Sequence, residues 1–392
     1  MVDDQPIIGE AVRRMFLGVD GIAFHYCRDP AAALAMASEI EPTVVLLDLV
    51  MPGIDGLELL RRFRHEERFH DLPIIVLSTK EEAAVKAEAF SLGASDYLVK
   101  LPDRVEMLAR VRHHSRGHTA LRERNEAFEA LRASRQVLAN DLASAAQYVR
   151  SLLPPPAVLP GVKIDWRFIP SADLGGDAFG YHLLDEDHVA IYLLDVCGHG
   201  VGAALLSVSA LNAVRSETLP NVDFHAPGAV LAALNRAFRM ERQNDMFFTI
   251  WYGVYEISSR RLRWSGGGHP PALLLTGPTA TGSHGGNANP QPTTALALES
   301  DGPLIGAVEG IAFETHDIAV PPRSTLYVFS DGAFEIGLKD GSMWTLSEFR
   351  TLLETPTPGG SQLLDTLVGH ARQISSHQDF QDDFSIVEIE FS

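Results

Sequence analysis

The run Val189-Ala190-Ile191-Tyr192-Leu193-Leu194-Asp195-Val196-Cys197-Gly198-His199-Gly200 is the most informative stretch of the second half of this chain. Its first six residues predict a buried strand, and Asp195 follows directly at the end of that strand. Two further apolar runs, 325–329 and 386–389, also lie beside aspartates. The three other aspartate signatures are Gly175-Gly176-Asp177, Ser330-Asp331-Gly332 and Asp382-Asp383-Phe384-Ser385.

Carboxylates at strand ends can converge on one point in a fold even when they are far apart in sequence. Several carboxylates at one point repel each other unless cations lie between them, so the signatures predict hard divalent metals with oxygen ligands. Metal pairs held in this way hydrolyse phosphate esters with water as the nucleophile. This half of the chain has no serine elbow, no cysteine phosphate loop and no P-loop, which agrees with a mechanism that needs no protein nucleophile.

The bulk composition narrows the class of protein. The chain has 392 residues, enough for two or three domains, and a formal net charge of −19, which argues against nucleic acid as a partner. Its two cysteines, Cys27 and Cys197, form no metal motif or disulfide framework, so we expect a cytoplasmic protein. We find no long apolar run and no leader, so no membrane partner is expected.

Residues 1–103 alternate short apolar strands with amphipathic helices, a pattern that predicts a doubly wound parallel sheet covered on both faces. The expected strands are 21–26, 43–47, 73–77 and 95–99, and the first strand of the five is reduced to a stub before Asp3 and Asp4. The expected helices are 8–17, 30–39, 56–65, 81–92 and one that starts near 103.

Polar residues follow the strands of this sheet. Asp48 ends the apolar run 44–47, Ser78 ends 74–77, and Lys100 ends 97–99. In open α/β sheets the ligand site lies at this edge. The sequence therefore predicts a pocket in which Asp3 and Asp4 hold a metal, Asp48 is the nucleophile, and Lys100 and Ser78 contact a phosphoryl group.

This arrangement resembles the receiver domain of two-component response regulators over about residues 1–115. The residues that carry the resemblance are Asp3-Asp4, Asp48, Met51-Pro52-Gly53, Asp55-Gly56, Ser78, Tyr97 and Lys100. The resemblance implies that Asp48 accepts phosphate from a sensor histidine kinase, and that Ser78, Tyr97 and Lys100 form the switch. It implies one magnesium ion bound by Asp3, Asp4, Asp48 and the carbonyl of Val50. A receiver that has lost phosphotransfer is the alternative.

Residues 104–153 predict one long helix that ends at Pro154-Pro155-Pro156. Eight positions with alternating spacings of three and four form a heptad seam with one charged member. They are Phe128, Leu131, Arg135, Leu138, Leu142, Ala145, Val149 and Leu152. We expect a parallel coiled coil that forms a homodimer, and a solvated linker helix packed on its own domain is the alternative.

Residues 160–392 predict a β-rich domain with two helical stretches, near 203–216 and 227–242, and a surface loop over 277–292. The four signatures, together with Gly266-Gly267-Gly268-His269-Pro270-Pro271 and Pro303-Leu304-Ile305-Gly306, resemble the metal-dependent serine/threonine protein phosphatase (PPM) family. The branch resembled is that of the sporulation phosphatase SpoIIE and the sigma-factor regulatory phosphatases. The resemblance implies an α+β fold, a β-sandwich flanked by helices, joined to the receiver by the long helix.

The resemblance also implies two manganese or magnesium ions and a role for each aspartate. Asp177 would bind one metal, and Asp195 would bridge both with a carbonyl of Val196 or Gly198. Asp331 and Asp382 would complete the shell of the other metal, with Asp383 beside it. The chain departs from the family at Gly180, where many relatives carry a further aspartate.

Three other residues of these motifs have a structural interpretation beside the chemical one. A histidine in the turn that contains His199 is expected to be positional, and His269, between Gly268 and Pro270, is expected to be structural. Cys197 is expected to pack, because hard cations prefer oxygen ligands.

We therefore interpret the chain as a response regulator whose phosphorylation at Asp48 controls a phosphatase acting on phosphoserine or phosphothreonine. By the family resemblance, the substrate would be a phosphorylated anti-sigma factor antagonist of the sulfate-transporter/antisigma (STAS) type. A catalytically weak phosphatase fold that sequesters a partner under receiver control is the alternative. A DNA-binding regulator that uses the arginine-rich start of the long helix is disfavoured by the charge and by the lack of a helix-turn-helix.

Overall fold

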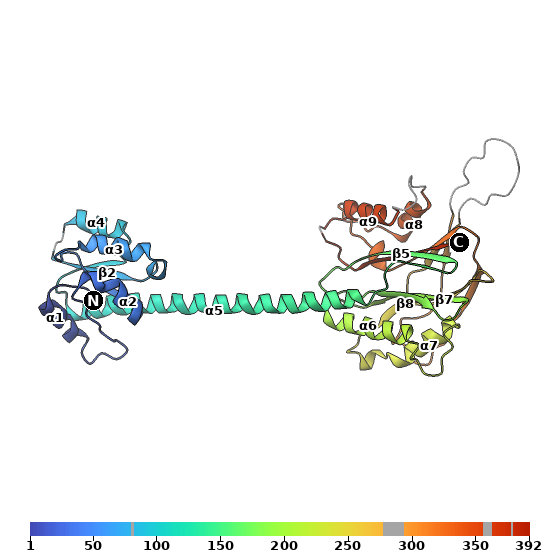
Figure 1. The fold of residues 1–392 in the computed structure, drawn as a ribbon, viewed down its shortest axis with the longest axis horizontal. Coiled ribbons are helices and arrows are strands. Elements are labelled where there is room, and N and C mark those ends of the chain that lie inside the picture. Colours follow the sequence, from blue (N-terminus) through green and yellow to red (C-terminus); the bar gives the residue numbers. More distant parts are fainter. Residues whose placement is uncertain (80–81, 277–293, 356–362, 378) are drawn as a thin grey trace, which may run out of the picture. The chain divides into compact units, whose positions relative to one another are not determined.

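The computed structural model describes residues 1–79, 82–276, 294–355, 363–377 and 379–392 (Figure 1). The chain divides into two compact units, Met1–Val137 and Leu138–Ser392, and each is described by itself below. The surface loop expected over 277–292 lies outside the described residues.

The sheet of the first unit is parallel, with the order β1-β2-β3. Its strands are β1 (Val45–Asp48), β2 (Ile74–Ser78) and β3 (Asp96–Val99). Single bridges join Val2 to both Leu47 and Cys27 and mark the positions of two further strands. The strand expected over 21–26 does not form, because its neighbour on this side is a stub in which Val2 alone makes bridges.

Helices cover both faces of this sheet, as the doubly wound pattern predicts. Alternate residues of β1 enter different cores: Leu47 packs in one with Phe63 of α3, and Leu46 packs in the other with Val12 of α1. The helices are α1 (Pro6–Phe16), η1 (Pro30–Ala32), α2 (Ala33–Ile40), α3 (Gly56–His65), η2 (Glu67–Phe69) and α4 (Ala83–Ser91).

Helix α5 (Arg104–Ser151) begins as the last helix of the first unit and ends in the second, since the boundary between the units lies after Val137. Met107 and Val111 in its first two turns are buried against the sheet. The seam residues Phe128, Leu131 and Leu138 are 63%, 51% and 60% exposed. Packing against the first unit therefore accounts only for the start of this helix.

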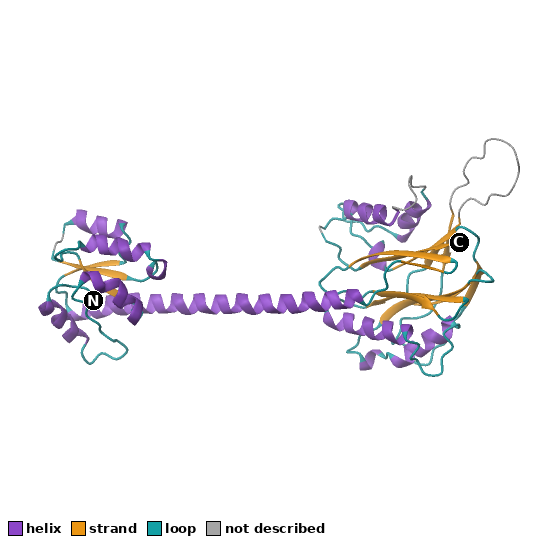
Figure 2. Cartoon of the chain, viewed as in Figure 1, coloured by secondary structure: helices purple, strands orange, loops and turns teal. Residues whose placement is uncertain are grey.

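The second unit is a sandwich of two antiparallel sheets with helices on the outside (Figure 2). The orders are β11-β10-β13-β14-β5-β4 in the six-stranded sheet and β12-β9-β8-β7-β6 in the five-stranded sheet. The strands are β4 (Ala157–Leu159), β5 (Val162–Ile169), β6 (Ala178–Leu183), β7 (His188–Val196), β8 (Phe248–Glu256), β9 (Arg261–Gly267), β10 (Ala272–Thr276), β11 (Thr294–Leu298), β12 (His316–Ala319), β13 (Ser324–Phe329) and β14 (Phe384–Phe391).

Two pairs of helices flank the sandwich. Helices α6 (Val201–Arg215) and α7 (Pro227–Ala237) pack on the five-stranded sheet, where the two helical stretches were expected, and a turn η3 (Met240–Arg242) follows α7. Helices α8 (Leu346–Glu354) and α9 (Leu363–Ile374) pack on the six-stranded sheet and were not predicted. Successive side chains of β10 point to opposite faces of the sheet: Leu274 packs in the central core, and Leu273 packs with residues of α8 and α9.

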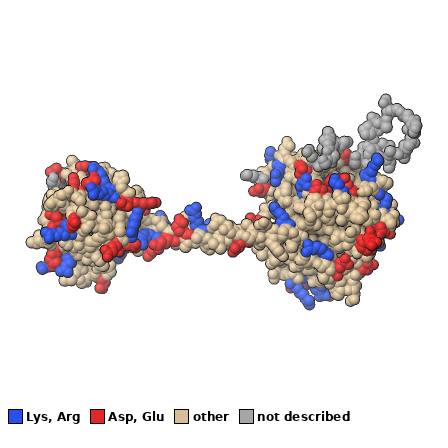
Figure 3. All heavy atoms as spheres, in the orientation of Figure 1, with Lys and Arg blue, Asp and Glu red and all other residues tan. Residues whose placement is uncertain are grey.

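Neither the charges on the face drawn in Figure 3 nor the described helices indicate a membrane-facing surface. On the face seen in Figure 3, basic and acidic side chains intermingle over both units. Among the described residues, no helix combines the length and the apolar character that crossing a bilayer requires.

Candidate active site

The end of β7 brings Asp195 to the mouth of the sandwich. The strand is buried along nearly its whole length, and Asp195, paired with Thr249 of β8, is its partly exposed penultimate residue. Gly198 and Gly200 then adopt φ angles of 83° and 91°, a region that favours glycine. This turn reverses the chain into α6, so strand, turn and helix are fixed by one short motif.

Two glycines allow the loop before β6 to lie against this turn. A Cβ on Gly176 would lie 2.5 Å from the carbonyl oxygen of Val196 and 3.1 Å from that of Gly198. The amide of Gly200 donates to the carbonyl of Leu174 at 3.0 Å. Because glycine permits this approach, the loop places Asp177 beside Asp195 and beside the carbonyl groups of Val196 and Gly198.

Asp331 and Asp382 reach the same region from neighbouring strands. Strands β13 and β14 are antiparallel, with Phe329 opposite Ile386, so the residues after β13 and before β14 lie at one edge. Asp331 opens a short turn, η4 (Asp331–Ala333), and Asp382 lies two residues before β14. The hydroxyl of Ser330 ties the two segments together by donating to the carbonyl of Asp383 at 3.0 Å.

The electrostatics show that these aspartates form one cluster. Burial, followed by the charges of Asp331 and Asp382, raises the pKa of Asp195 to about 7. Burial and the charges of Asp195 and Asp383 raise the pKa of Asp177 well above its ordinary range. Burial is also the first cause that raises the pKa of Asp331 and of Asp382. Like charges that raise each other's pKa are close in space.

The donor set of this cluster fits divalent cations. Within the described part of the chain, both carboxylate oxygens of Asp177 and Oδ1 of Asp331 are buried without a hydrogen-bond partner. Buried polar atoms of this kind need a partner, and carboxylate and carbonyl oxygens are the ligands that hard cations prefer. Bound cations would also remove the repulsion that raises the four pKa values.

Asp383 has a different environment from Asp382. Its Oδ1 accepts from the amide and hydroxyl of Ser171 at 2.8 and 3.0 Å, and its Oδ2 accepts from the amides of Gly176 and Asp177 at 2.6 and 3.3 Å. Four donors therefore occupy the carboxylate that the sequence placed among the metal ligands. In this structure Asp383 holds the loop that carries Asp177.

The other residues of the motifs have packing contacts. His269 is buried, its Nδ1 lies 2.8 Å from the hydroxyl of Thr249, and burial lowers its pKa to about 3, so it is neutral. The thiol of Cys197 accepts from the amide of Phe247 at 3.3 Å. His199 is exposed, and its charge lowers the pKa of Asp382, which places it near the cluster.

The position of the family's further aspartate is filled in another way. A Cβ on Gly180 would lie 2.5 Å from the hydroxyl oxygen of Tyr192, a buried residue on the adjacent strand β7. The side chain of Tyr192 thus occupies the room that an aspartate at this position would need. Glu335, which also raises the pKa of Asp331, is a neighbour of the cluster that the sequence did not suggest.

The first unit holds a second group of carboxylates, at the carboxyl edge of its sheet. Metal-ligand atoms of Asp3, Asp4 and Asp48 lie within 4.8 Å of one another. The ammonium of Lys100 lies 2.8 Å from Asp3 Oδ2 and 2.7 Å from Asp48 Oδ2. The pKa of Asp48 is raised because its burial outweighs the opposing effect of Lys100. The structure therefore brings together the acids and the lysine that the sequence singled out.

The remaining receiver residues lie around this group. Ser78 is fully buried at the end of β2, and Val50, whose amide donates to Asp48 Oδ1 at 3.2 Å, is exposed. Tyr97 is buried on β3, with the ammonium of Lys86 5.2 Å from its ring centre. The adjacent Asp96 accepts from the guanidinium of Arg110 on α5, so β3 is tied directly to the long helix.

The fold and the two carboxylate sites define a class of protein in which a receiver domain is joined to a metal-dependent-phosphatase fold. The family model "Response regulator receiver domain" matches residues 1–112, and "Stage II sporulation protein E (SpoIIE)" matches residues 185–392. Because the second match covers more than half of the chain, the chain belongs to the SpoIIE family and carries an N-terminal receiver domain.

Curated relatives resemble one or both parts. The regulator of RpoS from Escherichia coli K12 is 28% identical over 253 residues, 63% of this chain and 74% of its own. The phosphoserine phosphatase RsbP from Bacillus subtilis is 27% identical over 199 residues, 50% of this chain and 45% of its own. The DNA-binding regulator RpaA from Synechocystis is 36% identical over 112 residues, 29% of this chain. The chain spans less than half the length of RpaA and RsbP, 46% and 45%.

A solved structure supports the fold of the second unit. The SiaA-PP2C domain of Pseudomonas aeruginosa superposes with a TM-score of 0.54 and 19% identity, over 66% of this chain and 99% of that domain. At this identity the likeness establishes the phosphatase-type fold alone.

Proposed function

We propose that this protein is a response regulator whose output domain is a metal-dependent serine/threonine protein phosphatase. The observation that carries the proposal is the convergence of Asp177, Asp195, Asp331 and Asp382. Their charges raise one another's pKa, and buried oxygens among them have no hydrogen-bond partner in the described chain. A protein that keeps such a costly cluster uses it to bind cations.

Each residue has a part in this proposal. Asp177, Asp195, Asp331 and Asp382 would hold two manganese or magnesium ions, with Asp195 shared between the two. The carbonyls of Val196 and Gly198 would offer further oxygen ligands, and Asp383 keeps the Asp177 loop in place. Two ions bound here would supply a water of lowered pKa and neutralise a phosphate group.

The substrate is a phosphoserine or phosphothreonine on a partner protein. The likeness to RsbP, whose name is that of a phosphoserine phosphatase, supports this assignment. Within that class we propose a phosphorylated STAS-type anti-sigma factor antagonist. Cys27 and Cys197 of the present chain are both free, which is compatible with a reaction in the cytoplasm.

The receiver site is the input. A sensor histidine kinase transfers phosphate to Asp48, with one magnesium ion held by Asp3, Asp4, Asp48 and the carbonyl of Val50. Lys100 lies between the two buried carboxylates, where an ammonium group can also contact a phosphoryl oxygen. Phosphorylation at Asp48 is relayed through Ser78 and Tyr97 towards β3 and α5.

The exposed seam of α5 supports a homodimer, because Phe128, Leu131 and Leu138 recur at heptad spacing on one side of the helix. Sedimentation at micromolar concentration should show a dimer for the wild type and a monomer for Leu131→Glu/Leu138→Glu. Val137→Glu is the matched control, since Val137 is 61% exposed but lies off the seam. A monomeric wild type in both phosphorylation states would reject the dimer.

The catalytic proposal is tested by phosphate release from p-nitrophenyl phosphate and from a phosphoserine-containing STAS protein, with and without manganese. We expect release that requires manganese and is lost in Asp331→Asn. Metal-independent release, or equal rates for wild type and Asp331→Asn, would contradict the assignment.

A second candidate is a phosphatase fold that sequesters its partner with little turnover. The side chain of Tyr192 fills the space next to Gly180, the position at which many relatives have an aspartate, and this favours weaker catalysis. In that case the phosphoprotein would bind the wild-type protein stably, and manganese would release no phosphate.

A further inference from the structure

A second cluster of ligand-type side chains lies at the opposite end of β7 from Asp195. Asp185 belongs to the turn between β6 and β7, His188 is the first residue of β7, and His225 belongs to the loop before α7. His188 and Asp195 are seven positions apart on one strand, which at about 3.3 Å per residue places them roughly 23 Å apart. This cluster is therefore separate from the phosphatase site.

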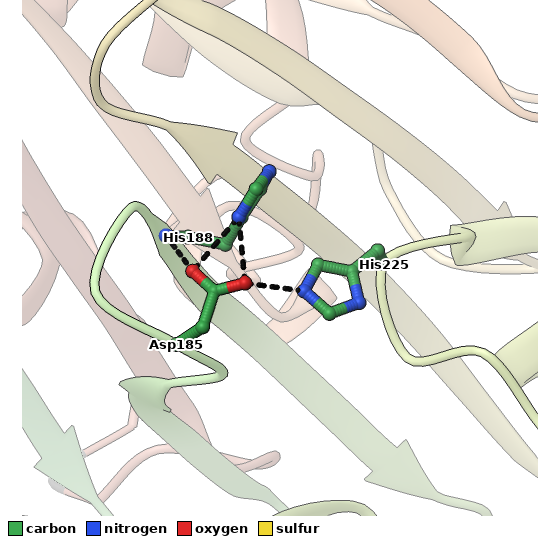
Figure 4. Close-up of side chains that lie close together, drawn as sticks. All are labelled: Asp185, His188 and His225. Atoms are coloured by element: carbon green, nitrogen blue, oxygen red, sulfur yellow. Dashed lines mark hydrogen bonds and ion pairs between the residues drawn. The ribbon is translucent and has the colours of Figure 1, made fainter.

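One carboxylate oxygen faces both imidazole rings. Asp185 Oδ2 lies 3.0 Å from His188 Nδ1 and 2.9 Å from His225 Nε2. Figure 4 shows both rings turned towards this carboxylate. Metal-ligand atoms of the three residues lie within 4.8 Å of one another, and their side chains are 18–45% exposed, so an ion can enter from solvent.

The cluster is held in this arrangement by its backbone. Asp185 Oδ1 accepts from the amides of Asp187 and His188, both at 2.8 Å. On the other loop, the carbonyl of Phe224 accepts from the hydroxyl of the buried Tyr252 at 2.8 Å. The ligand atoms are therefore positioned before any ion binds, which reduces the ordering cost of binding.

The imidazole ring of His225 contacts more carboxylates than a neutral ring has N–H groups to donate. His225 has a carboxylate at each nitrogen, Asp223 at 3.0 Å from Nδ1 and Asp185 at 2.9 Å from Nε2. A neutral imidazole has a single N–H group, so one of these contacts needs an additional cation. Either a second proton on His225 or a metal ion at one of its two nitrogens meets this need.

Asp223 can fix which nitrogen of His225 would face a metal. When Nε2 of His225 binds a metal, its Nδ1 carries the proton and donates to the Asp223 carboxylate, whose Oδ1 lies 3.0 Å away. A carboxylate behind a histidine in this way is the usual outer partner of a zinc-bound histidine.

We propose that Asp185, His188 and His225 form a binding site for a zinc-class transition metal, with Asp223 orienting His225 and water as the fourth ligand. Ligand atoms around a tetrahedral zinc are about 3.4 Å apart, given metal–ligand distances of about 2.0–2.1 Å. The contacts of 2.9–3.0 Å need only a small expansion to admit the ion. The ion would join the β6–β7 turn to the loop that starts α7, so its role is structural.

The site is tested on the full-length chain after chelation and exchange into buffer with millimolar magnesium, which occupies the oxygen-ligand sites. Zinc affinity is then measured by competition with a chromophoric chelator. We expect the wild type to bind one more zinc ion than His188→Gln/His225→Gln, and Asp223→Asn to bind it about 10-fold more weakly. His70→Gln, which changes an exposed histidine of the other unit, should behave as wild type. Equal zinc binding by the wild type and the double variant would overturn the proposal.

A second measurement needs no variant and so does not depend on folding of the double mutant. Histidines of the wild-type chain are modified with diethyl pyrocarbonate with and without one equivalent of zinc, and modified sites are mapped by mass spectrometry. We expect zinc to protect His188 and His225 but not His70. Equal modification with and without zinc would show that Asp185, His188 and His225 are joined by hydrogen bonds alone, and it would overturn the metal site.

Discussion

The two carboxylate sites of this protein differ in where their positive charge comes from. In the receiver, Lys100 lies within 2.8 Å of both Asp3 and Asp48. In the phosphatase cluster, no lysine or arginine of the described residues forms an ion pair with Asp177, Asp195, Asp331 or Asp382, and the pKa of each of these acids is raised.

This difference is related to the task of each site. A receiver takes up one phosphoryl group and must remain folded with and without it, so a fixed ammonium group that neutralises its buried acids is useful. A site that activates water on metals needs its carboxylates free for the metals, and a fixed ammonium would compete with them. We therefore expect the first site to be stable in the absence of metal and the second to depend on ions from solution.

The largest expected effect is that of removing one charge from the phosphatase cluster. Asp195→Asn should lower manganese-dependent phosphate release by roughly 10³-fold, because Asp195 is the proposed bridging ligand. In metal-free protein the same change should raise the melting temperature, since it relieves repulsion within the cluster. Phosphate release and calorimetry check the two halves, and Asp301→Asn at an exposed position is the control. Activity close to wild type would show that Asp195 is not a ligand.

Removing the lysine from the receiver site leaves its buried carboxylates without a fixed positive charge, as in the phosphatase cluster. Lys100→Met leaves Asp3 and Asp48 buried without their counterion, which should cost about 3 kcal/mol of receiver stability. Millimolar magnesium should restore part of that loss in the variant and have less effect on the wild type. Thermal unfolding with and without magnesium measures this, with Arg28→Met as the control. A variant as stable as wild type without magnesium would remove the basis of the comparison.

Variants of Asp383 and Asp382 distinguish a residue that positions a loop from a residue that binds metal. Asp383→Ala leaves the amides of Ser171 and Gly176 without their acceptor and should destabilise the second unit by about 2–3 kcal/mol. Asp382→Ala should abolish activity without that loss. Denaturant unfolding, together with manganese titration of activity, distinguishes the two. Equal stability of the two variants would contradict a positioning role for Asp383 and would favour its assignment as a metal ligand.

The smallest effect expected is the pH dependence of the metal-free protein. The pKa of Asp195 is raised from 3.8 to about 7, so between these values the folded state binds more protons than the unfolded chain. Stability contributed by this group is therefore lost as pH rises through that window, and Asp177 acts in the same direction. We expect the melting temperature of the second unit to fall by a few degrees between about pH 5 and pH 8, and saturating manganese to abolish the fall. A melting temperature that rises with pH in the metal-free protein would contradict repulsion among these carboxylates.

Local signals in the sequence were sufficient for the elements that they specify. Helix α3 occupies the predicted residues 56–65, because Asp55 caps it by accepting from the amide of Leu57 and its apolar residues fall on one face. The strand expected over 21–26 failed because pairing depends on a neighbour that is a stub. Helix α8 was missed although Thr345 and Glu348 form a capping box, a signal that was available in the sequence.

The convergence of the aspartates could be predicted from the sequence, but the separate contacts of each one could not. Strand-end position and neighbouring glycines identify Asp177, Asp195, Asp331 and Asp382. The donors to Asp383 come from residues more than 200 positions earlier, so its role depends on tertiary structure. The same holds for the histidine cluster, where Asp185 and His188 are close in sequence but His225 arrives from another loop.

The central claim is that phosphorylation of Asp48 controls the phosphatase, and its most direct test is the rate of phosphate release from a phosphoserine-containing STAS protein. Wild type and Asp48→Ala are compared with and without acetyl phosphate, at saturating manganese. We predict that acetyl phosphate changes the rate of the wild type and leaves Asp48→Ala unchanged. Equal rates in all four reactions would contradict control of the enzyme by the receiver.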